Sequence, residues 1–344
     1  MHADQDNLPE SDTRAFAEYI RTLGRGPGRS RALTFDEAEA ACSMICDGRA
    51  TPAQVGAFLV LLRYRGESPA ELAGLVHALR STVALPSPRP PVDLDWPTYA
   101  AGRTRGLPWY VLSALLLAAN GVRIFMHGGH DCDAPATSPA AALTMLGVPL
   151  SMTLVEAADR LVSARFAYMP LGRLCPKLRE LIDLRAVLGV RTIANTAARM
   201  LNPLAAPHLI QGVFHPSYRE LQQAAAVLLG QPRLAVFKGG GGEAERPASK
   251  STEIYTVDRG RTGTENWPAL TQGDSGRSEK LSPETVKDAR PMFELWHGTR
   301  EDAGAEALVI GTAAVAVRLL DMVGSAAEAD VLAREWWKRR PAAV

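Results

Sequence analysis

The spacing of apolar residues changes on either side of a proline-rich segment, and this change constrains the fold more than any other feature of the chain. Residues 86–97 hold five prolines in twelve positions, which a helix interior does not tolerate because proline lacks an N–H and clashes with the preceding turn. Helix start signals recur before this segment, and strand-like runs alternate with helical stretches beyond it. We therefore predict an all-helical domain over residues 1–85, joined by part of 172–190, and an α/β domain over residues 92–344.

The first domain contains three helix start signals at short intervals. Thr34 is followed three residues later by Glu37, Thr51 is followed by a first-turn proline, and Ser68 is followed by a proline and then by Glu71. Each hydroxyl is therefore able to cap the helix that begins after it. Apolar residues recur every three or four positions after each cap, and short turns separate the runs. This pattern is typical of a helical bundle.

The second domain contains short β-prone runs separated by helical stretches. The strand candidates are Val122–Met126, Leu209–Phe214, Arg233–Phe237 and Glu253–Val257. Strands that alternate with helices indicate parallel pairing through crossover connections. The fold class that we predict is thus α/β, with a small N-terminal all-helical domain and a mainly parallel sheet flanked by helices. Residues 258–289 are rich in Gly, Thr, Ser and charge, and we expect them to form a mostly exposed loop.

Composition excludes some classes of protein. Lys and Arg together number 38 against 37 for Asp and Glu, a net charge of +1, which argues against a uniformly basic nucleic-acid coat but leaves a local basic patch possible. The longest apolar run, Val111–Ala119, is too short to span a bilayer, and the N-terminus is polar. The four cysteines are scattered, as in proteins of a reducing compartment. We expect a cytoplasmic protein with no membrane partner.

Two segments resemble one enzyme family. Leu33–Leu79 is similar to the N-terminal helical domain of the anthranilate phosphoribosyltransferase family and of its relatives the nucleoside phosphorylases, and Arg185–Pro203 is similar to the family segment R-x-x-L-G-x-R-T-x-F-N-x-L-G-P-L-x-N-P. The resemblance continues through His208–Phe237 and covers about residues 33–255. It implies a small helical domain joined to a larger α/β domain, and a homodimer formed through the helical domains.

The resemblance also implies positions for the site. The residues that it places in a pocket are His127, Gly128, Asn195, Asn202 and Pro203. Glu243 and Glu245 match the family's metal-binding acidic pair only loosely. No residue is identified as catalytic.

Three elements depart from the family's pattern. The glycine-rich turn D-G-T-G-G-D, whose amides bind pyrophosphate in the family, is matched by Asp93–Gly102, where Leu94, Trp96 and Pro97 replace small residues. The K-H-G-N element is matched by Met126–Gly129, which lacks the lysine and the asparagine. An arginine, Arg199, replaces the family's proline. These departures predict that the pyrophosphate-binding turn and the parent activity have been lost.

Positive charge accompanies these losses. The residues predicted to contact phosphates are Arg103, Arg105, Arg173, Lys177, Arg179, Arg185, Arg191, Arg199 and Lys238, with the amides of Gly239, Gly240, Gly241 and Gly242. Arginines and lysines bind phosphates without sequence preference, and consecutive glycine amides form an anion nest. For any single residue, pairing with an acidic neighbour on a solvated helix face is an equally good interpretation.

Three hypotheses follow from these patterns. The first is that the chain resembles the divergent YbiB-like DNA-binding subgroup of the family, and that its homodimer binds DNA or RNA along a basic interdomain groove and requires no cofactor. The second is an active glycosyl or phosphoribosyl transferase that uses phosphoribosyl pyrophosphate (PRPP) and Mg²⁺ on an unidentified acceptor, so that a phosphorylated small molecule is its ligand. The third is a structural or regulatory dimer whose groove contacts an acidic protein.

Overall fold

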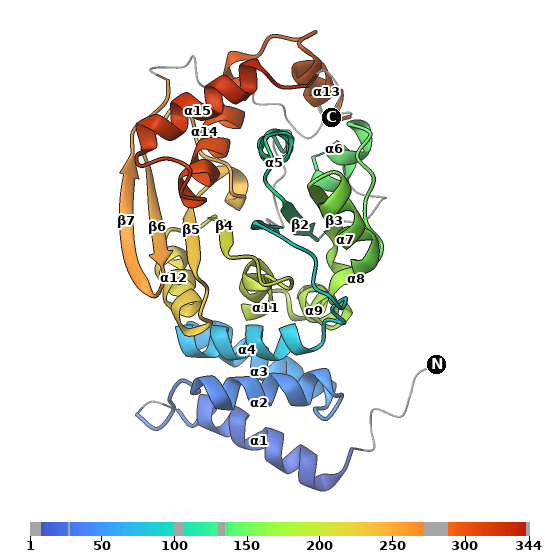
Figure 1. Ribbon diagram of the computed structural model, residues 1–344. Coiled ribbons are helices and arrows are strands. Elements are labelled where there is room, and N and C mark those ends of the chain that lie inside the picture. The colour runs from blue at the N-terminus through green and yellow to red at the C-terminus, as the bar shows by residue number, and fades with distance from the viewer. Residues whose placement is uncertain are drawn as a thin grey trace.

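A computed structural model describes residues 8–26, 28–99, 106–129, 135, 137–271 and 288–341. A bundle of N-terminal helices lies against one end of a larger α/β body, and helices cover both faces of that body's sheet (Figure 1). The observed fold confirms the predicted fold class. Among the helices of the described ranges, none is both long and apolar enough to cross a membrane.

The bundle consists of α1 (Glu10–Gly24), α2 (Phe35–Cys46), α3 (Pro52–Arg65) and α4 (Pro69–Ser81). All three predicted caps form: the side chains of Thr34, Thr51 and Ser68 each accept a hydrogen bond from the backbone N–H three residues later. Gly74 of α4 lets the backbones of α2 and α4 approach closely, because a Cβ built there would lie 2.4 Å from the carbonyl oxygen of Phe35.

The sheet has seven strands in the order β3-β2-β1-β4-β5-β6-β7. Their bounds are β1 (Leu94–Thr98), β2 (Ile124–Gly128), β3 (Phe166–Pro170), β4 (His208–Val213), β5 (Arg233–Lys238), β6 (Thr252–Asp258) and β7 (Arg261–Trp267). The first five strands in chain order are parallel, and β6 and β7 are antiparallel. The chain moves outward from β1 on one side and from β4 on the other. The direction of winding therefore reverses between β1 and β4, and ligands of open α/β sheets bind at such a reversal.

Alternate strand residues pack into two hydrophobic cores, one on each face of the sheet. One face is covered by α5 (Tyr110–Ala119), α6 (Pro139–Met145), α13 (Arg290–His297), α14 (Ala303–Leu319) and α15 (Ala326–Lys338). The other face is covered by α7 (Leu154–Ser163), α8 (Leu171–Leu174), α9 (Pro176–Asp183), α10 (Arg185–Leu188), α11 (Ile193–Ala197), the short helix η1 (Ala198–Met200) and α12 (Tyr218–Leu228).

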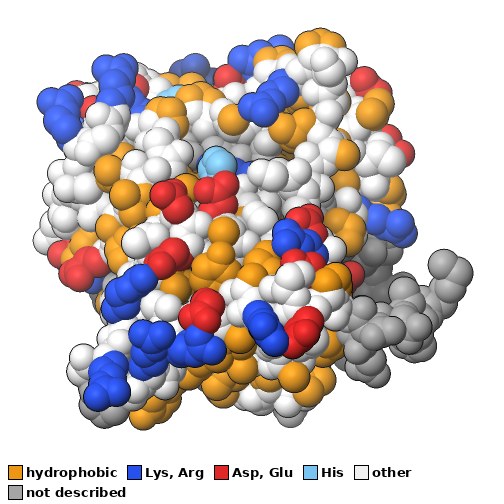
Figure 2. Space-filling model, turned by 90° about the horizontal axis from the view of Figure 1, so that it is seen from below, with side chains coloured by type: hydrophobic (Ala, Val, Ile, Leu, Met, Phe, Trp, Pro, Cys, Tyr) orange, Lys and Arg blue, Asp and Glu red, His pale blue; other side chains and the backbone are white. Residues whose placement is uncertain are grey.

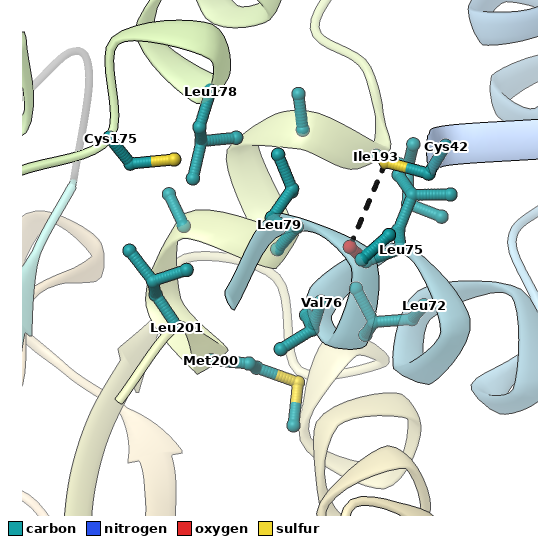
Figure 3. Close-up of a cluster of buried hydrophobic side chains, with 14 of the residues drawn as sticks. Cys42, Leu72, Leu75, Val76, Leu79, Cys175, Leu178, Ile193, Met200 and Leu201 are labelled. Carbon is teal, nitrogen blue, oxygen red and sulfur yellow. Dashed lines mark hydrogen bonds between the residues drawn. The ribbon is translucent and has the colours of Figure 1, made fainter. Parts of the chain in front are cut away.

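The second of these cores runs without a break into the helical bundle. Leu72, Leu75, Val76 and Leu79 of α4 face apolar side chains from α9, α11 and the segment after it (Figure 3). The thiol of Cys42 on α2 donates to the carbonyl of Leu75 at 3.8 Å. Cys42 is therefore a packed thiol, as its place on an apolar helix suggests. We name this contact between α4 and the α/β body the junction.

The structure corrects two sequence predictions. Leu94, Trp96 and Pro97 were expected in an altered phosphate-binding turn, but they lie inside the buried strand β1. Proline is tolerated there because the pairing of β1 with β4 stops at Asp95, so Pro97 has no β4 neighbour. The second correction concerns residues 258–289, which contain the strand β7 rather than loop alone.

Candidate functional site

A pocket of about 100 Å³ opens at the reversal point between β1 and β4. Tyr99 directly follows the carboxyl end of β1, and Phe214 and His215 follow β4, and all three line the pocket. This is the edge at which open α/β sheets bind their ligands. The topology therefore makes this pocket the candidate site.

Three helical segments form the walls of the pocket. Thr192, Asn195 and Arg199, at the start of α11, within it and in η1, line one wall, and their spacing of three and four residues places them on one helix face. Tyr218 of α12 lines a second wall. Arg63 of α3 brings a side chain from the helical bundle. The pocket is thus shared between the bundle and the α/β body.

Three arginines give the pocket its charge. Arg63 donates a hydrogen bond to the Tyr218 hydroxyl. Arg199 donates to the carbonyl oxygens of Asn195 at 2.8 Å and of Tyr99 at 2.9 Å, which ties η1 to the end of β1. Arg191 also lines the pocket.

The pKa values of two arginines report this crowding. Burial lowers the pKa of Arg191, and the positive charges of Arg185 and Arg63 lower it further. Burial also lowers the pKa of Arg199, while Glu243 acts in the opposite direction. Positive groups that repel one another in a partly dry pocket favour the entry of an anion.

Arg63, Tyr218 and His215 were not identified as site residues from the sequence. Each lies far along the chain from Arg185–Pro203, and only the fold brings them together. The spacing of Arg63 resembles that of any solvated arginine near the end of a helix. A signal did exist for His215, since it directly follows a predicted strand.

The predicted pocket residue His127 lies behind the pocket rather than in it. Its ring is fully buried on β2, and Nδ1 lies 2.5 Å from the Tyr99 hydroxyl while Nε2 lies 3.1 Å from Asp95 Oδ2. Burial raises the pKa of Tyr99 well above its usual value, so the phenol keeps its proton. His127 therefore supports Tyr99 from below. Gly128 is required by packing, because a Cβ there would lie 2.2 Å from Thr98 Oγ1.

The other predicted pocket residues divide into two groups. Asn195 lines the pocket, and its Oδ1 accepts from the Thr192 N–H at 3.3 Å. Asn202 is buried instead in the loop before β4, where its amide bonds both backbone groups of Ala206 at 2.8 and 2.9 Å. Pro203 is buried beside it. These last two residues hold the loop in shape and do not line the pocket.

The glycine loop after β5 packs against β4. A Cβ on Gly239 would lie 1.7 Å from the carbonyl oxygen of Glu243, and Gly241 and Gly242 have positive φ angles of 64° and 90°. Gly240 begins the short helix η2 (Gly240–Gly242). Glycine is therefore required here by a tight turn. Lys238 at the end of β5 is exposed.

The two glutamates predicted as metal ligands are 5 % and 3 % exposed. Glu245 Oε2 accepts from the backbone N–H of Tyr110 at 3.3 Å, at the start of α5, where a carboxylate stabilises a helix end. Glu243 is buried against Arg199. No group of three potential metal-binding side chains occurs among the residues that the structure describes. The pair Glu243 and Glu245 thus does not fit a Mg²⁺ site.

The predicted basic residues do not converge on one groove. Lys177 pairs with Glu180 at 2.6 Å and Arg179 with Asp183 at 2.8 Å, as on an ordinary solvated helix face. Arg173 and Arg185 are exposed. Of the predicted basic residues, Arg191 and Arg199 line the pocket, and Arg103 and Arg105 lie outside the described residues. On the face shown in Figure 2, basic side chains are interspersed with acidic and apolar ones.

Comparisons with known proteins assign the chain to a family. The model described as "Glycosyl transferase family, helical bundle domain" matches residues 17–83, and "Glycosyl transferase family, a/b domain" matches residues 111–340. The anthranilate phosphoribosyltransferase of Thermomicrobium roseum is 30 % identical over 310 residues, which cover 88 % of each chain. That of Brevibacillus brevis is 31 % identical over 274 residues, which cover 75 % of this chain and 79 % of the relative.

Solved structures agree in fold. The crystal structure of anthranilate phosphoribosyltransferase from Thermus thermophilus superposes with a TM-score of 0.77 at 24 % identity and covers 94 % of both chains. The enzyme of the same name from Saccharomyces cerevisiae, in complex with PRPP and Mg, gives a TM-score of 0.72 at 16 % identity and covers 94 % of this chain and 93 % of that one.

These findings overturn the first hypothesis, that of DNA or RNA binding with loss of the parent activity. The matching relatives are phosphoribosyltransferases, and the arginines expected to form a continuous groove are divided between surface ion pairs and a small pocket. From the helical bundle, the sheet order, the pocket at the reversal point and these relatives, we conclude that the chain belongs to the anthranilate phosphoribosyltransferase-like glycosyl transferase family.

Proposed function

We propose that this protein is a phosphoribosyl transferase that moves the phosphoribosyl group of PRPP to an acceptor bound in the pocket at the reversal point. The observation that carries the proposal is the convergence of Arg63, Arg191 and Arg199 at the carboxyl ends of β1 and β4. The names of the relatives make anthranilate, an anionic aromatic amine, the first acceptor to test.

The reaction breaks the bond between the ribose C1 and a pyrophosphate oxygen and forms a bond from C1 to the acceptor nitrogen. The acceptor loses a proton, and pyrophosphate leaves with the electron pair. The pocket contributes by holding an anionic acceptor on its guanidiniums with the amine presented to the sugar, which replaces a bimolecular encounter by a fixed geometry. Apolar walls from Val213 and Phe214 shield this contact from water.

The site for the donor lies outside what these residues define. Residues 100–105, directly beyond β1 and Tyr99, are not described, so no phosphate contact is assigned to them. Glu243 and Glu245 do not fit Mg²⁺, and no step is assigned to a metal. Dependence on Mg²⁺ is therefore part of the test.

The test measures PRPP binding and turnover with the full chain. Calorimetry with PRPP and Mg²⁺ should show micromolar binding, and mixing with anthranilate should release one pyrophosphate for each anthranilate consumed. Omission of Mg²⁺ shows whether the metal is needed. Absence of PRPP binding, together with no pyrophosphate release from a panel of aromatic amines, would overturn the proposal.

Assembly as a homodimer through the helical bundle remains a proposal. It is supported by a row of exposed apolar residues at helical spacing on α3, namely Ala53, Ala57, Val60 and Tyr64, of which Tyr64 is 89 % exposed. Exposed apolar rows of this kind mark protein contacts. Light scattering of the wild type and of Tyr64→Arg tests it, and a monomeric wild type would contradict it.

Two finer predictions also remain proposals. One is membership of a divergent subgroup of the family, which rests on Arg199 in place of proline and on the Met126–Gly129 element. The other is a cytoplasmic location, which rests on the scattered cysteines and the polar N-terminus.

A further inference from the structure

Two buried polar atoms of pocket-lining residues have no hydrogen-bond partner. Gln222 is 1 % exposed and its Oε1 is unpartnered, and Thr192 is 5 % exposed and its Oγ1 is unpartnered. Native proteins leave few buried polar atoms unsatisfied, and each such atom calls for an explanation. Here both atoms belong to the walls of the same cavity.

The helix α12 orients Gln222 toward this cavity. Gln222 lies four residues after Tyr218, so both side chains project from one face of the helix, and both line the pocket. The next residue, Gln223, faces the sheet, where its Nε2 donates to the carbonyls of Thr256 and Gly263, each at 2.8 Å. Two adjacent glutamines thus have different environments, one satisfied by the protein and one not.

The unpartnered atoms and the arginines require different things of a ligand. An amide oxygen only accepts hydrogen bonds, and a hydroxyl both donates and accepts, whereas Arg63 and Arg191 only donate. An anion alone satisfies the arginines but leaves Gln222 Oε1 without a partner. A ligand that satisfies both has an anionic group and an N–H donor in one small molecule.

We propose that Gln222 is a specificity-determining residue of the pocket: its Oε1 accepts an N–H of the acceptor amine, with Thr192 Oγ1 as a second contact, while Arg63 and Arg191 hold the acceptor's anionic group. This inference rests on the proposed function and narrows the acceptor to anionic amines. A site built to pair with a substrate N–H rejects the analogue that lacks it, because the buried group is then left unsatisfied.

The test compares two probes that differ only in the amine. Anthranilate and benzoate share a ring and a carboxylate, and calorimetry with the full chain should give a Kd for anthranilate about five- to tenfold lower than that for benzoate, which is the effect of one hydrogen bond. In Gln222→Met, a substitution of similar shape without the acceptor, this ratio should fall to about one while benzoate affinity is unchanged. The melting temperature should not fall, because an unsatisfied amide has been removed.

Gln223→Met is the matched control on the same helix. It removes two hydrogen bonds to the sheet, so it should lower the melting temperature and leave the anthranilate to benzoate ratio at its wild-type value. Equal affinity of the wild type for both probes, failure of both to bind, or an unchanged ratio in Gln222→Met would overturn the inference. Because the assay needs no PRPP, a protein that discriminates the probes but transfers no phosphoribosyl group would overturn the proposed function alone.

Discussion

The junction and the pocket are built from neighbouring parts of the same helices but differ in how well their groups are satisfied. At the junction, apolar side chains of α4 are buried against α9 and α11, and the Arg80 guanidinium donates to the carbonyls of Leu201 at 2.7 Å and Met200 at 3.0 Å (Figure 3). In the pocket, arginines crowd one another and two polar atoms have no partner. The junction is organised for stability, and the pocket has left room for a ligand.

This difference teaches where mutations should act. Changes at the junction should lower stability and leave ligand preference intact, whereas changes in the pocket should alter ligand binding and cost little stability. Functional sites commonly depart from the local consistency that holds the rest of a protein together. Four substitutions test whether the separation holds.

The largest effect is expected for Leu79→Ala at the junction. Leu79 is fully buried in the core that joins the bundle to the sheet, so its truncation should lower the free energy of unfolding by about 2–5 kcal/mol, since a lost methyl cluster also leaves a cavity. Urea titration measures the change. Val187→Ala, at a side chain that is 82 % exposed, is the control and should change stability by less than about 0.5 kcal/mol. Equal losses in both variants would show that the junction is not a packed core.

Arg80→Met tests the polar part of the junction. The guanidinium satisfies two carbonyls in a setting where burial lowers its pKa. Removing it leaves those oxygens without their donor and should cost about 2–3 kcal/mol of unfolding free energy, measured by urea titration. Arg14→Met, which breaks an exposed pair with Glu10, should be nearly neutral. A stable Arg80→Met with altered ligand binding would place Arg80 with the pocket instead.

The bundle could be predicted from the sequence because its information is local. Each cap lies within three residues of its partner, as at Thr34 and Glu37, and forms as predicted. The strands β1 and β7 could not be predicted in this way. Pro97 gives β1 the composition of a linker, and the exposed, polar face of β7 hides its alternation, since its register with β6 is set by the turn at Arg259 and Gly260.

The pocket could be predicted only where one segment supplies it. Arg191, Asn195 and Arg199 lie within nine residues and were identified, because a helical face is readable from spacing. Arg63 and Gln222 come from α3 and α12 and meet them only through the sheet order and the junction. The same limit explains why Lys177 and Arg179 were expected beside the pocket. Their acidic partners lie three and four residues away, and pairing with them is invisible until the helix face is known.

Arg191→Ala tests the pocket side of the comparison. Loss of a charge-assisted hydrogen bond should weaken anthranilate binding by about 10- to 100-fold, which corresponds to about 1.5–3 kcal/mol. The free energy of unfolding should change by less than about 0.5 kcal/mol, because repulsion from Arg63 and Arg185 is relieved. Calorimetry and urea titration on the same variant measure both quantities. Arg173→Ala, at an exposed residue of α8, should alter neither, and a variant of Arg191 that binds normally would remove it from the site.

The smallest effect is expected for Glu37→Gln in the bundle, and it depends on pH. The Glu37 carboxylate accepts two hydrogen bonds from Arg31, each of 2.6 Å, and one from the Thr34 N–H at 2.9 Å, and these lower its pKa from 4.5 to about 2, with the Arg31 hydrogen bond as the largest cause. The unfolded chain therefore binds the proton more tightly than the folded protein. The stabilisation is complete above pH 4.5 and is lost as the pH falls through about 2.

Glu37 is partly exposed, so solvent screening limits this contribution to at most about 1 kcal/mol. The difference in unfolding free energy between wild type and Glu37→Gln should be largest at pH 7 and should narrow as urea titrations are repeated down to about pH 2.5, close to the folded-state pKa. Glu10→Gln, which alters a more exposed pair on α1, should show a smaller difference at every pH. A difference for Glu37 that does not vary with pH would mean that the amide loses shape complementarity rather than charge, and satisfied charges would then not be part of what separates the bundle from the pocket.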